Sequence, residues 1–189
     1  MTYQRMHTPP ARPGALRLRG FSLVELIVTI AIIALISAVV LARYGSFNST
    51  VLLNSLAYDV ALSVREAQVL GISVRGDDGS FAAPYGMHFT EGTSYLLFVD
   101  RDESGHYDDG EEVSSYVIGQ GNAITSLCAD STCGLDTLDV LFERPEPDAI
   151  VYTDPASGTV DSVRVIVGAS TGQTRTVRVW PTGQIAVEE

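Results

Sequence analysis

The sequence predicts an α+β fold in which one long N-terminal helix packs on a C-terminal head of antiparallel β-sheet. Two patterns lead to this prediction. Residues 21–42 are almost entirely apolar, and helical periodicity continues beyond them to about residue 67. From about Phe81, short runs of β-branched and aromatic residues alternate with turn residues. We expect the first half of the helix to lie in a membrane.

Charge is distributed unevenly along the 189 residues. All 23 acidic residues follow Gly20, whereas four of the 12 arginines precede it, and the chain has no lysine. Residues 1–20 therefore carry +4, and the remainder, with eight arginines against 23 acidic residues, carries −15. Because phosphate binding needs clustered cations, the acidic remainder argues against a general nucleic-acid-binding protein.

Residues 21–42 are long enough to cross a bilayer. Residues 26–42 are 17 consecutive uncharged residues, and Glu25 is the one charged residue among the 22. A helix of this length measures about 33 Å, which matches the hydrocarbon core of a membrane. The arginines before the segment and the acidic residues after it predict a single-pass protein with its N-terminus inside and its head outside.

A cleaved secretory signal is the alternative for this segment, and Val40-Leu41-Ala42 would serve as its cleavage site. The apolar run is longer than the 7–15 residues or so that such a signal uses. It also contains Glu25, and an ionised carboxylate inside hydrocarbon costs about 2.5–3.5 kcal/mol on insertion scales. A segment used only for targeting has no need of that carboxylate, so we expect Glu25 to have a partner.

The sequence Gly-Phe-Ser-Leu-Val-Glu-Leu at residues 20–26 resembles the class III signal of type IV prepilins and type II secretion pseudopilins. That pattern is a basic leader, then Gly and Phe, with Glu at the fifth mature position and a long apolar run. The resemblance implies that a prepilin peptidase removes residues 1–20 by cutting after Gly20 and then methylates Phe21. Because the cut precedes the apolar helix, residues 21–42 would be kept as a transmembrane and filament-core helix.

Glu25 is the residue on which assembly is expected to depend. Cleavage would leave an α-amine on Phe21 that is cationic near neutral pH. Glu25 of a neighbouring subunit would pair with that amine in a bundle of apolar helices, which favours assembly and sets the axial stagger. The alternative is that Glu25 merely lies at the headgroup level. The implied partners are other pilins or pseudopilins, the prepilin peptidase and the inner-membrane assembly platform.

Residues 43–76 are expected to continue the helix and to link it to the head. Gly45 disfavours helix by about 1 kcal/mol, which predicts a bend or local melting. Further on, apolar residues recur at helical spacing and predict the face on which the head packs, while Ser63 is expected on the opposite face. Gly71 or Gly76 is expected to end the helix. The predicted packing face consists of Leu53, Leu56, Ala57, Val60, Ala61, Val64 and Ala67.

Residues 77–189 are expected to form the extracytoplasmic β-rich head. Val163, Val165 and Val167 alternate with Arg164 and Ile166, as in a strand with one buried face. Turn residues separate the runs, and the C-terminus is expected to be a meander. The predicted strands span residues 85–89, 94–100, 113–118, 123–127, 138–142, 150–153, 162–167, 174–180 and 185–187.

The head is similar to that of the H-type minor pseudopilins and the FimT/FimU minor pilins. A Tyr-Gly-x-x-Phe strand at 85–89, an Asp-rich hairpin at 100–111 and a closing Thr-x-x-Val-x-Val-x-x-x-Gly-x-Ile pattern at 174–185 follow the family order, although Gly183-Gln184 replaces the usual Gly-Arg turn. The resemblance implies a minor pseudopilin of type II secretion, with a minor type IV pilin in pilus assembly or DNA uptake as the alternative. Both imply the bacterial inner membrane and a periplasmic head.

Residues 100–111 match the spacing of a 12-residue EF-hand loop, with Gly105 at its sixth position. Hard oxygen ligands at alternating positions are what Ca²⁺ requires. The flanks are predicted strands, so this would be an EF-like loop on a hairpin, and the alternative is a solvated acidic turn without metal. The predicted calcium ligands are Asp100, Asp102, Ser104, His106, Asp108 and Glu111.

Two cysteines, Cys128 and Cys133, lie five residues apart in a turn-rich stretch. If this part of the chain is exported, the pair predicts a disulfide. A zinc site would need more ligands, and His7, His88 and His106 are not near the cysteines in the sequence.

Two other classes of protein fit the sequence less well. An anchored enzyme would need a nucleophile with a base or paired carboxylates, but Gly-x-Ser-x-Gly, Walker and His-Glu-x-x-His patterns are absent from the sequence, and His88 is expected to be a half-buried strand residue. A DNA receptor would need a basic surface, whereas Arg175 and Arg178 have opposite strand parity and the head is acidic. We therefore expect neither catalysis nor nucleic-acid binding.

Overall fold

The computed structural model describes residues 20–73, 83–156 and 158–188. These residues form one helix followed by ten strands, which confirms the predicted α+β class. Two units are compact by themselves, Met1–Arg43 and Tyr44–Glu189. Most of the predicted leader, Gly76 and the first residues of the predicted head lie outside the described residues.

The helix α1 runs from Leu23 to Ile72. It begins at a polar cap, because the hydroxyl of Ser22 accepts a hydrogen bond of 3.2 Å from the backbone N–H of Glu25. The backbone is also helical at Gly45, so the predicted local melting is wrong. A single glycine disfavours helix by only about 1 kcal/mol, and cooperative propagation from the helical turns on either side absorbs it.

Within the unit Tyr44–Glu189, α1 packs on the strands with the predicted face. Ser63, which was predicted on the opposite, solvent-facing side of the helix, is instead buried. Its side chain is only 6% exposed, and its hydroxyl lies 3.2 Å from that of Tyr95. The prediction for Ser63 is therefore wrong, because a hydroxyl with a buried partner can replace an apolar side chain in a core. The fully buried residues of the predicted face are Leu53, Ala57, Val60, Val64 and Ala67.

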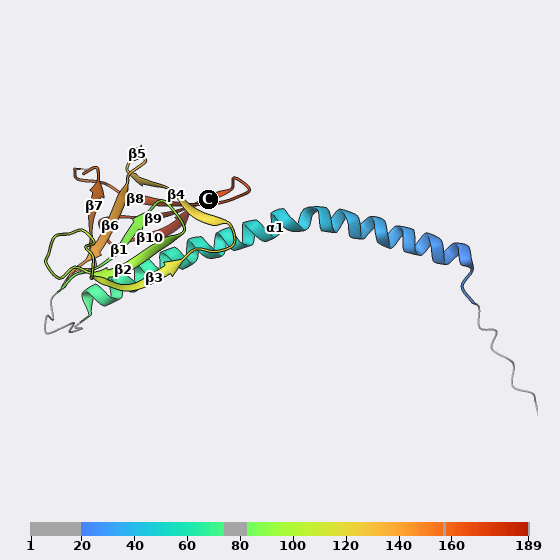
Figure 1. Cartoon of the computed structure of the whole chain (residues 1–189), viewed down its shortest axis with the longest axis horizontal. Coiled ribbons are helices and arrows are strands. Elements are labelled where there is room, and N and C mark those ends of the chain that lie inside the picture. The colour runs from blue at the N-terminus through green and yellow to red at the C-terminus, as the bar shows by residue number, and fades with distance from the viewer. Residues whose placement is uncertain (1–19, 74–82, 157, 189) are drawn as a thin grey trace, which may run out of the picture. The chain divides into compact units, whose positions relative to one another are not determined.

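The strands that follow α1 pair antiparallel throughout and build two five-stranded sheets (Figure 1). The strands are β1 (Tyr85–Thr90), β2 (Ser94–Val99), β3 (Glu112–Val117), β4 (Asn122–Ala129), β5 (Thr132–Cys133), β6 (Thr137–Phe142), β7 (Ala149–Asp154), β8 (Val163–Ala169), β9 (Thr174–Val179) and β10 (Ile185–Glu188).

The strand order is β3-β2-β1-β6-β7 in one sheet and β10-β9-β8-β4-β5 in the other. All nine predicted strands are present, each with ends within two residues of the prediction. The exception to the predicted set is β5, whose two residues are too few to show an alternating pattern. The valines 163, 165 and 167 of β8 are buried as predicted, and with the apolar face of α1 they belong to one core.

Gly71 does not end α1 but lets it approach β6 closely. A Cβ atom at this position would lie 2.2 Å from the carbonyl oxygen of Phe142. The helix ends one residue later, at Ile72, and the N–H of Ser73 donates to the carbonyl of Val69 at 3.1 Å. The role predicted for Gly71 is therefore wrong, and a close backbone contact explains the glycine.

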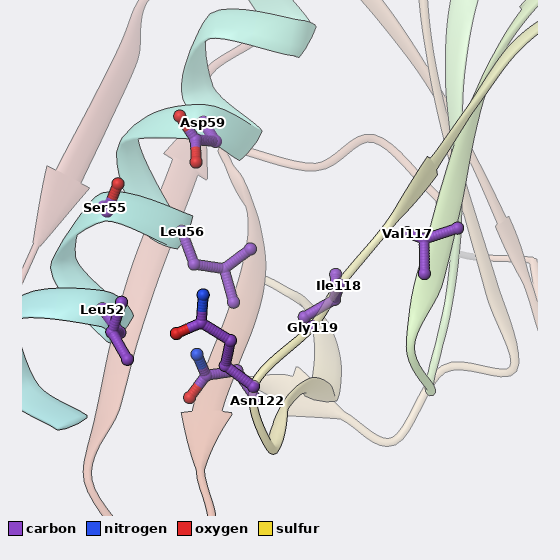
Figure 2. A pocket seen from close by; sticks show the side chains of 9 residues that line it. Leu52, Ser55, Leu56, Asp59, Val117, Ile118, Gly119 and Asn122 are labelled. Carbon is purple, nitrogen blue, oxygen red and sulfur yellow. The ribbon is translucent and has the colours of Figure 1, made fainter.

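The edge strand β3 lies beside α1 and is joined to it by Tyr116. A cavity of about 170 Å³ separates α1 from the turn between β3 and β4 (Figure 2). Next to it, the phenol of Tyr116 donates a hydrogen bond of 2.8 Å to Glu66 on α1, and its ring stacks on Tyr95 with centroids 5.0 Å apart. Burial, reinforced by the hydrogen bond to Glu66 and its charge, raises the pKa of Tyr116 to about 12.

This raised pKa predicts a loss of stability at alkaline pH. Tyrosine in the unfolded chain titrates near pH 10. Below that value both states keep the proton, so the contribution of Tyr116 is fully present. Between about pH 10 and pH 12 the unfolded state ionises first and the free energy of unfolding falls. Thermal unfolding measured across this pH range should show that stability falls less steeply with pH for Tyr116→Phe than for the wild type. Equal dependence of stability on pH in the two proteins would contradict the pKa assigned to Tyr116.

Candidate functional site

The first part of α1 is apolar, and no other described residues of the chain pack over it. Leu23–Leu41 is long and apolar enough to cross a membrane, and none of it is buried within the structure. Large apolar side chains such as Leu23, Leu35 and Leu41 are exposed. A helix that is apolar all round needs lipid or other helices around it. This segment and the sequence motif before it therefore support membrane anchoring.

Glu25 lies in the first turn of this apolar helix, four residues after the exposed side chain of Phe21. The backbone N–H of Glu25 donates to the hydroxyl of Ser22, and this hydrogen bond does not involve the carboxylate of Glu25. The helix dipole favours an acidic residue in the first turn by about 0.3–1 kcal/mol. This is smaller than the cost of placing a carboxylate in hydrocarbon, about 2.5–3.5 kcal/mol. A partner for Glu25 in an assembly remains a prediction.

The acidic loop between β2 and β3 is closed at its first end by Asp100. This carboxylate is buried, and its oxygens accept hydrogen bonds from the backbone N–H groups of Ser104 at 3.1 Å and Gly105 at 2.9 Å. Gly105 has a φ of 82° and its Cα lies against the ring of Tyr152, so a side chain would be strained there and would also collide with the ring.

Glu111 closes the other end of the loop. It is also buried, and its oxygens accept hydrogen bonds from the backbone N–H groups of Arg101 at 2.7 Å and Asp108 at 3.2 Å. Carboxylates that accept backbone N–H groups hold a turn in shape without any ion. The loop thus has an internal hydrogen-bonding scheme that would operate with or without a metal.

Three of the six predicted calcium ligands come together. Asp100, Asp102 and Glu111 each bring one carboxylate oxygen within 4.8 Å of the others, and a set of hard oxygen donors fits Ca²⁺ chemically. The hydroxyl of Ser104 instead donates to the carbonyl of His106 at 3.0 Å and to Asp108 at 3.3 Å. Calcium binding by this loop stays a prediction.

Calcium titration of the full chain in detergent micelles checks this prediction. We expect saturable 1:1 heat with a dissociation constant in the range of weak loops, about 1 mM or tighter. Asp102→Ala should weaken binding about tenfold or more, since its exposed carboxylate is the donor least engaged in the fold. Glu103→Ala is the matched control, because this neighbouring acid is outside the group of three. Calcium binding that is equally strong in Asp102→Ala and Glu103→Ala, or a wild type that does not bind calcium, would contradict the site.

The predicted ligand His106 has its imidazole turned toward a residue that the sequence did not indicate. Asp139 on β6 is 1% exposed, and its two oxygens lie 2.6 Å from Nδ1 of His88 and 3.1 Å from Nδ1 of His106. The imidazole of His106 also packs on the ring of Tyr152. Asp139 therefore joins the acidic loop to β1 and β6.

No local sequence signal could have found this cluster. His88 and Asp139 face each other because β1 and β6 pair in that register, and they are 51 residues apart in the chain. His106 is 33 residues from Asp139. His88 is half-buried on a strand, as predicted. The arrangement orients two imidazoles around one buried carboxylate and fixes the loop on the sheet.

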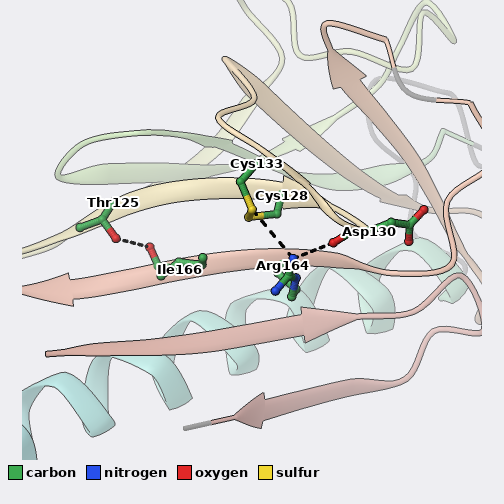
Figure 3. Close-up of a disulfide and its surroundings, with 6 residues drawn as sticks. All are labelled: Thr125, Cys128, Asp130, Cys133, Arg164 and Ile166. Carbon is green, nitrogen blue, oxygen red and sulfur yellow. Dashed lines mark hydrogen bonds between the residues drawn. A yellow bond between two sulfur atoms is a disulfide. The ribbon is translucent and has the colours of Figure 1, made fainter.

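The disulfide Cys128–Cys133 is present and joins β4 to β5 (Figure 3). Beside it, Nη2 of Arg164 donates a hydrogen bond of 2.6 Å to the carbonyl of Asp130 and lies 3.9 Å from Sγ of Cys133. A structural disulfide is typical of proteins outside the reducing cytoplasm. This agrees with an exported head.

The other two late arginines contact neighbouring groups in the head. Nε of Arg175 donates to the side chain of Asn54 on α1 at 2.6 Å. Arg178 forms an ion pair with Glu188 at 3.0 Å and lies over the ring of Trp180. These guanidinium groups therefore take part in packing and in tertiary hydrogen bonds.

Comparison with known proteins bears on the N-terminus and on most of the chain. Residues 17–41 match the family model of the prokaryotic N-terminal methylation motif. Over 126 residues the chain is 29% identical to the pilin-like protein PilA1 of Thermus thermophilus, a match that covers 66% of this chain and 76% of that protein. No solved structure matches the chain significantly. The methylation motif, the apolar start of α1 and this similarity agree with one another, and together they support a type IV pilin-like protein.

Proposed function

We propose that this chain is a minor pseudopilin, a structural subunit of the type II secretion pseudopilus that takes part in protein secretion and has no catalytic activity of its own. The observation that carries the proposal is Glu25, placed five residues after Gly20 at the start of an otherwise apolar and exposed helix. The match to the methylation motif supports cleavage after Gly20 and methylation of Phe21.

The proposed organisation follows the charge and hydropathy of the chain. Residues 1–20 are a cleaved leader, residues 21–42 the transmembrane and filament-core helix, residues 43–76 its amphipathic continuation and linker, and residues 77–189 the head. The basic leader faces the cytoplasm and the acidic head the periplasm of a bacterial inner membrane. The disulfide Cys128–Cys133 supports the placement of the head in an oxidising compartment.

The proposed partners are other pilin-like subunits, which pack along residues 21–41, together with the prepilin peptidase and the inner-membrane assembly platform. Lipid would cover the exposed apolar surface of Leu23–Leu41 before assembly, and helices of neighbouring subunits would cover it in the filament. The motif supports processing and assembly of this kind. Nucleic acid is not among the proposed partners, because residues 21–189 carry −15.

A minor type IV pilin, acting in pilus assembly or DNA uptake, is the second candidate. It is favoured by the similarity to a Thermus protein that is named pilin-like. Deletion of the gene separates the two candidates. A pseudopilin is required for release of proteins exported by type II secretion, whereas a pilin is required for surface pili or transformation.

Mass spectrometry of the protein purified from membranes tests the processing step. We expect a chain that begins at Phe21 with one added N-methyl group. Gly20→Leu should remain at full length, because the residue before the cut is changed. Gly14→Leu, a substitution of another leader glycine, should be processed normally. A mature-sized band from Gly20→Leu, or any other N-terminus in the wild type, would overturn the proposal.

A further inference from the structure

A groove runs between α1 and the edge strand β3. The cavity of about 170 Å³ shown in Figure 2 adjoins a second one of about 530 Å³, and the two share Leu56 and Asp59 on α1 with Val117 and Ile118 on the strand side. Every described residue that lines them belongs to the unit Tyr44–Glu189. The groove is therefore a property of the head and the part of α1 within it.

One wall of the groove is an unprotected sheet edge. β3 is the outermost strand of its sheet; its one charged residue is Glu112 at its start, and residues 113–120 beyond it contain neither a charge nor a proline. Val117 is 82% exposed, the largest exposed fraction among the large hydrophobic residues that the structure describes. Soluble proteins usually protect such edges with charged side chains, proline or a covering segment. Beyond Glu112 the edge lacks these devices and is therefore a template for another strand.

The hydrogen-bonding pattern shows which groups this edge offers. The N–H of Ile118 donates to the carbonyl of Thr93 at 2.8 Å, so it points into the sheet. In an antiparallel ladder the direction of the backbone groups alternates along the strand. The N–H and C=O groups of Val117 and Ser115 therefore point away from β2, toward the space beside the groove.

The second wall of the groove is α1, and its side chains indicate which side chains a bound segment would need. Along α1 the acidic side chains of Asp59 and Glu66 follow the apolar ones of Leu56 and Leu62, and Leu52, Ser55 and Ser63 complete this wall. Among the described residues, these two carboxylates are the only charged groups that line either cavity. Leu62 is exposed and offers apolar surface between them. A matching segment presents apolar and cationic side chains in turn on the face that it directs toward α1.

We propose that this groove binds an extended polypeptide segment of another protein, which adds to β3 as a new strand and directs alternating apolar and cationic side chains toward α1. Strand addition gives affinity through backbone hydrogen bonds and specificity through the alternate side chains. A second copy of this chain is a poor occupant, because residues 21–189 carry −15. The groove is separate from the residues 21–41 assigned to filament packing, so the inference does not depend on the proposed function.

A synthetic peptide tests the binding mode. The probe is Ac-Val-Thr-Arg-Thr-Val-Thr-Arg-NH₂, labelled for fluorescence anisotropy and titrated into the full chain in detergent micelles. Its Val and Arg side chains share one face and its Thr side chains the other. We expect binding that weakens about tenfold or more when both Arg are replaced by Glu, and likewise when the central Thr is replaced by Pro, which cannot donate a backbone hydrogen bond.

Two substitutions locate the site on the protein. Val117→Pro removes an N–H that points out of the sheet, so the ladder with β2 is kept, and circular dichroism checks that the chain stays folded. It should reduce probe binding about tenfold or more, whereas Val117→Thr keeps the N–H and should bind like the wild type. Asp59→Arg leaves one cation and one carboxylate on this wall, so it should abolish the preference for the Arg version of the probe over the Glu version.

Amide hydrogen exchange measured by NMR supplies an independent readout. Bound probe should slow exchange at Ser115 and Val117 about tenfold or more and leave Tyr116, whose N–H points into the sheet, unchanged. The inference is overturned if the probe does not bind, if folded Val117→Pro binds it as the wild type does, or if slowed exchange appears elsewhere. Equal binding of the Arg and Glu probes would overturn the stated chemistry of the partner.

Discussion

Replacing Glu25 with leucine is expected to leave membrane insertion intact and to remove the chain from filaments. The substitution makes the helix more apolar, so insertion becomes easier. In the assembled bundle, however, it would leave the α-amine of a neighbouring Phe21 without its partner. Loss of one member of a buried ion pair typically costs about 3–5 kcal/mol, which corresponds to a reduction of about 100-fold or more in incorporation.

Filament incorporation is measured by immunoblotting sheared filaments against the membrane fraction. Thr29→Leu is the matched control, since it removes another polar group from the same segment. The hydroxyl of Thr29 already donates to the carbonyl of Leu26 at 2.9 Å, so the control needs no partner subunit. Normal incorporation of Glu25→Leu would mean that apolar packing alone determines assembly.

The second large effect is expected from Gly71→Ala, which should destabilise the head. The new methyl group would lie 2.2 Å from the carbonyl oxygen of Phe142, and neither backbone can move without disturbing α1 or β6. Overpacking of this kind costs about 1–3 kcal/mol or more, against at most about 1 kcal/mol gained from the better helix propensity of alanine. We expect a net loss of about 2 kcal/mol, which lowers the melting temperature by about 4–8 °C.

Thermal unfolding followed by circular dichroism of the β-rich head measures this loss. Gly119→Ala is the control, because no atom lies within 4 Å of the Cβ position there and the substitution should change the melting temperature little. A Gly71→Ala protein as stable as the wild type would show that α1 and β6 are not in close contact in solution.

Much of the fold follows from local patterns. The apolar segment, the packing face of α1 and nine of the strands were predictable, because a helix or a half-buried strand repeats its side-chain directions every 3.6 or 2 residues. The disulfide was predictable because Cys128 and Cys133 are close in the chain. The strand β5 was not, since a two-residue strand contains no period.

The sequence alone determined the N-terminal motif around Gly20 and Glu25, the opposite charges on the two sides of the apolar segment, and the spacing of the acidic residues in 100–111. The tertiary structure decided which distant residues meet. Strand register placed Asp139 between two histidines, the approach of α1 to β6 explained Gly71, and sheet order left β3 at an edge beside α1. The reason is physical: periodicity and motifs are properties of consecutive residues, whereas contacts across tens of residues depend on how whole elements pair and pack.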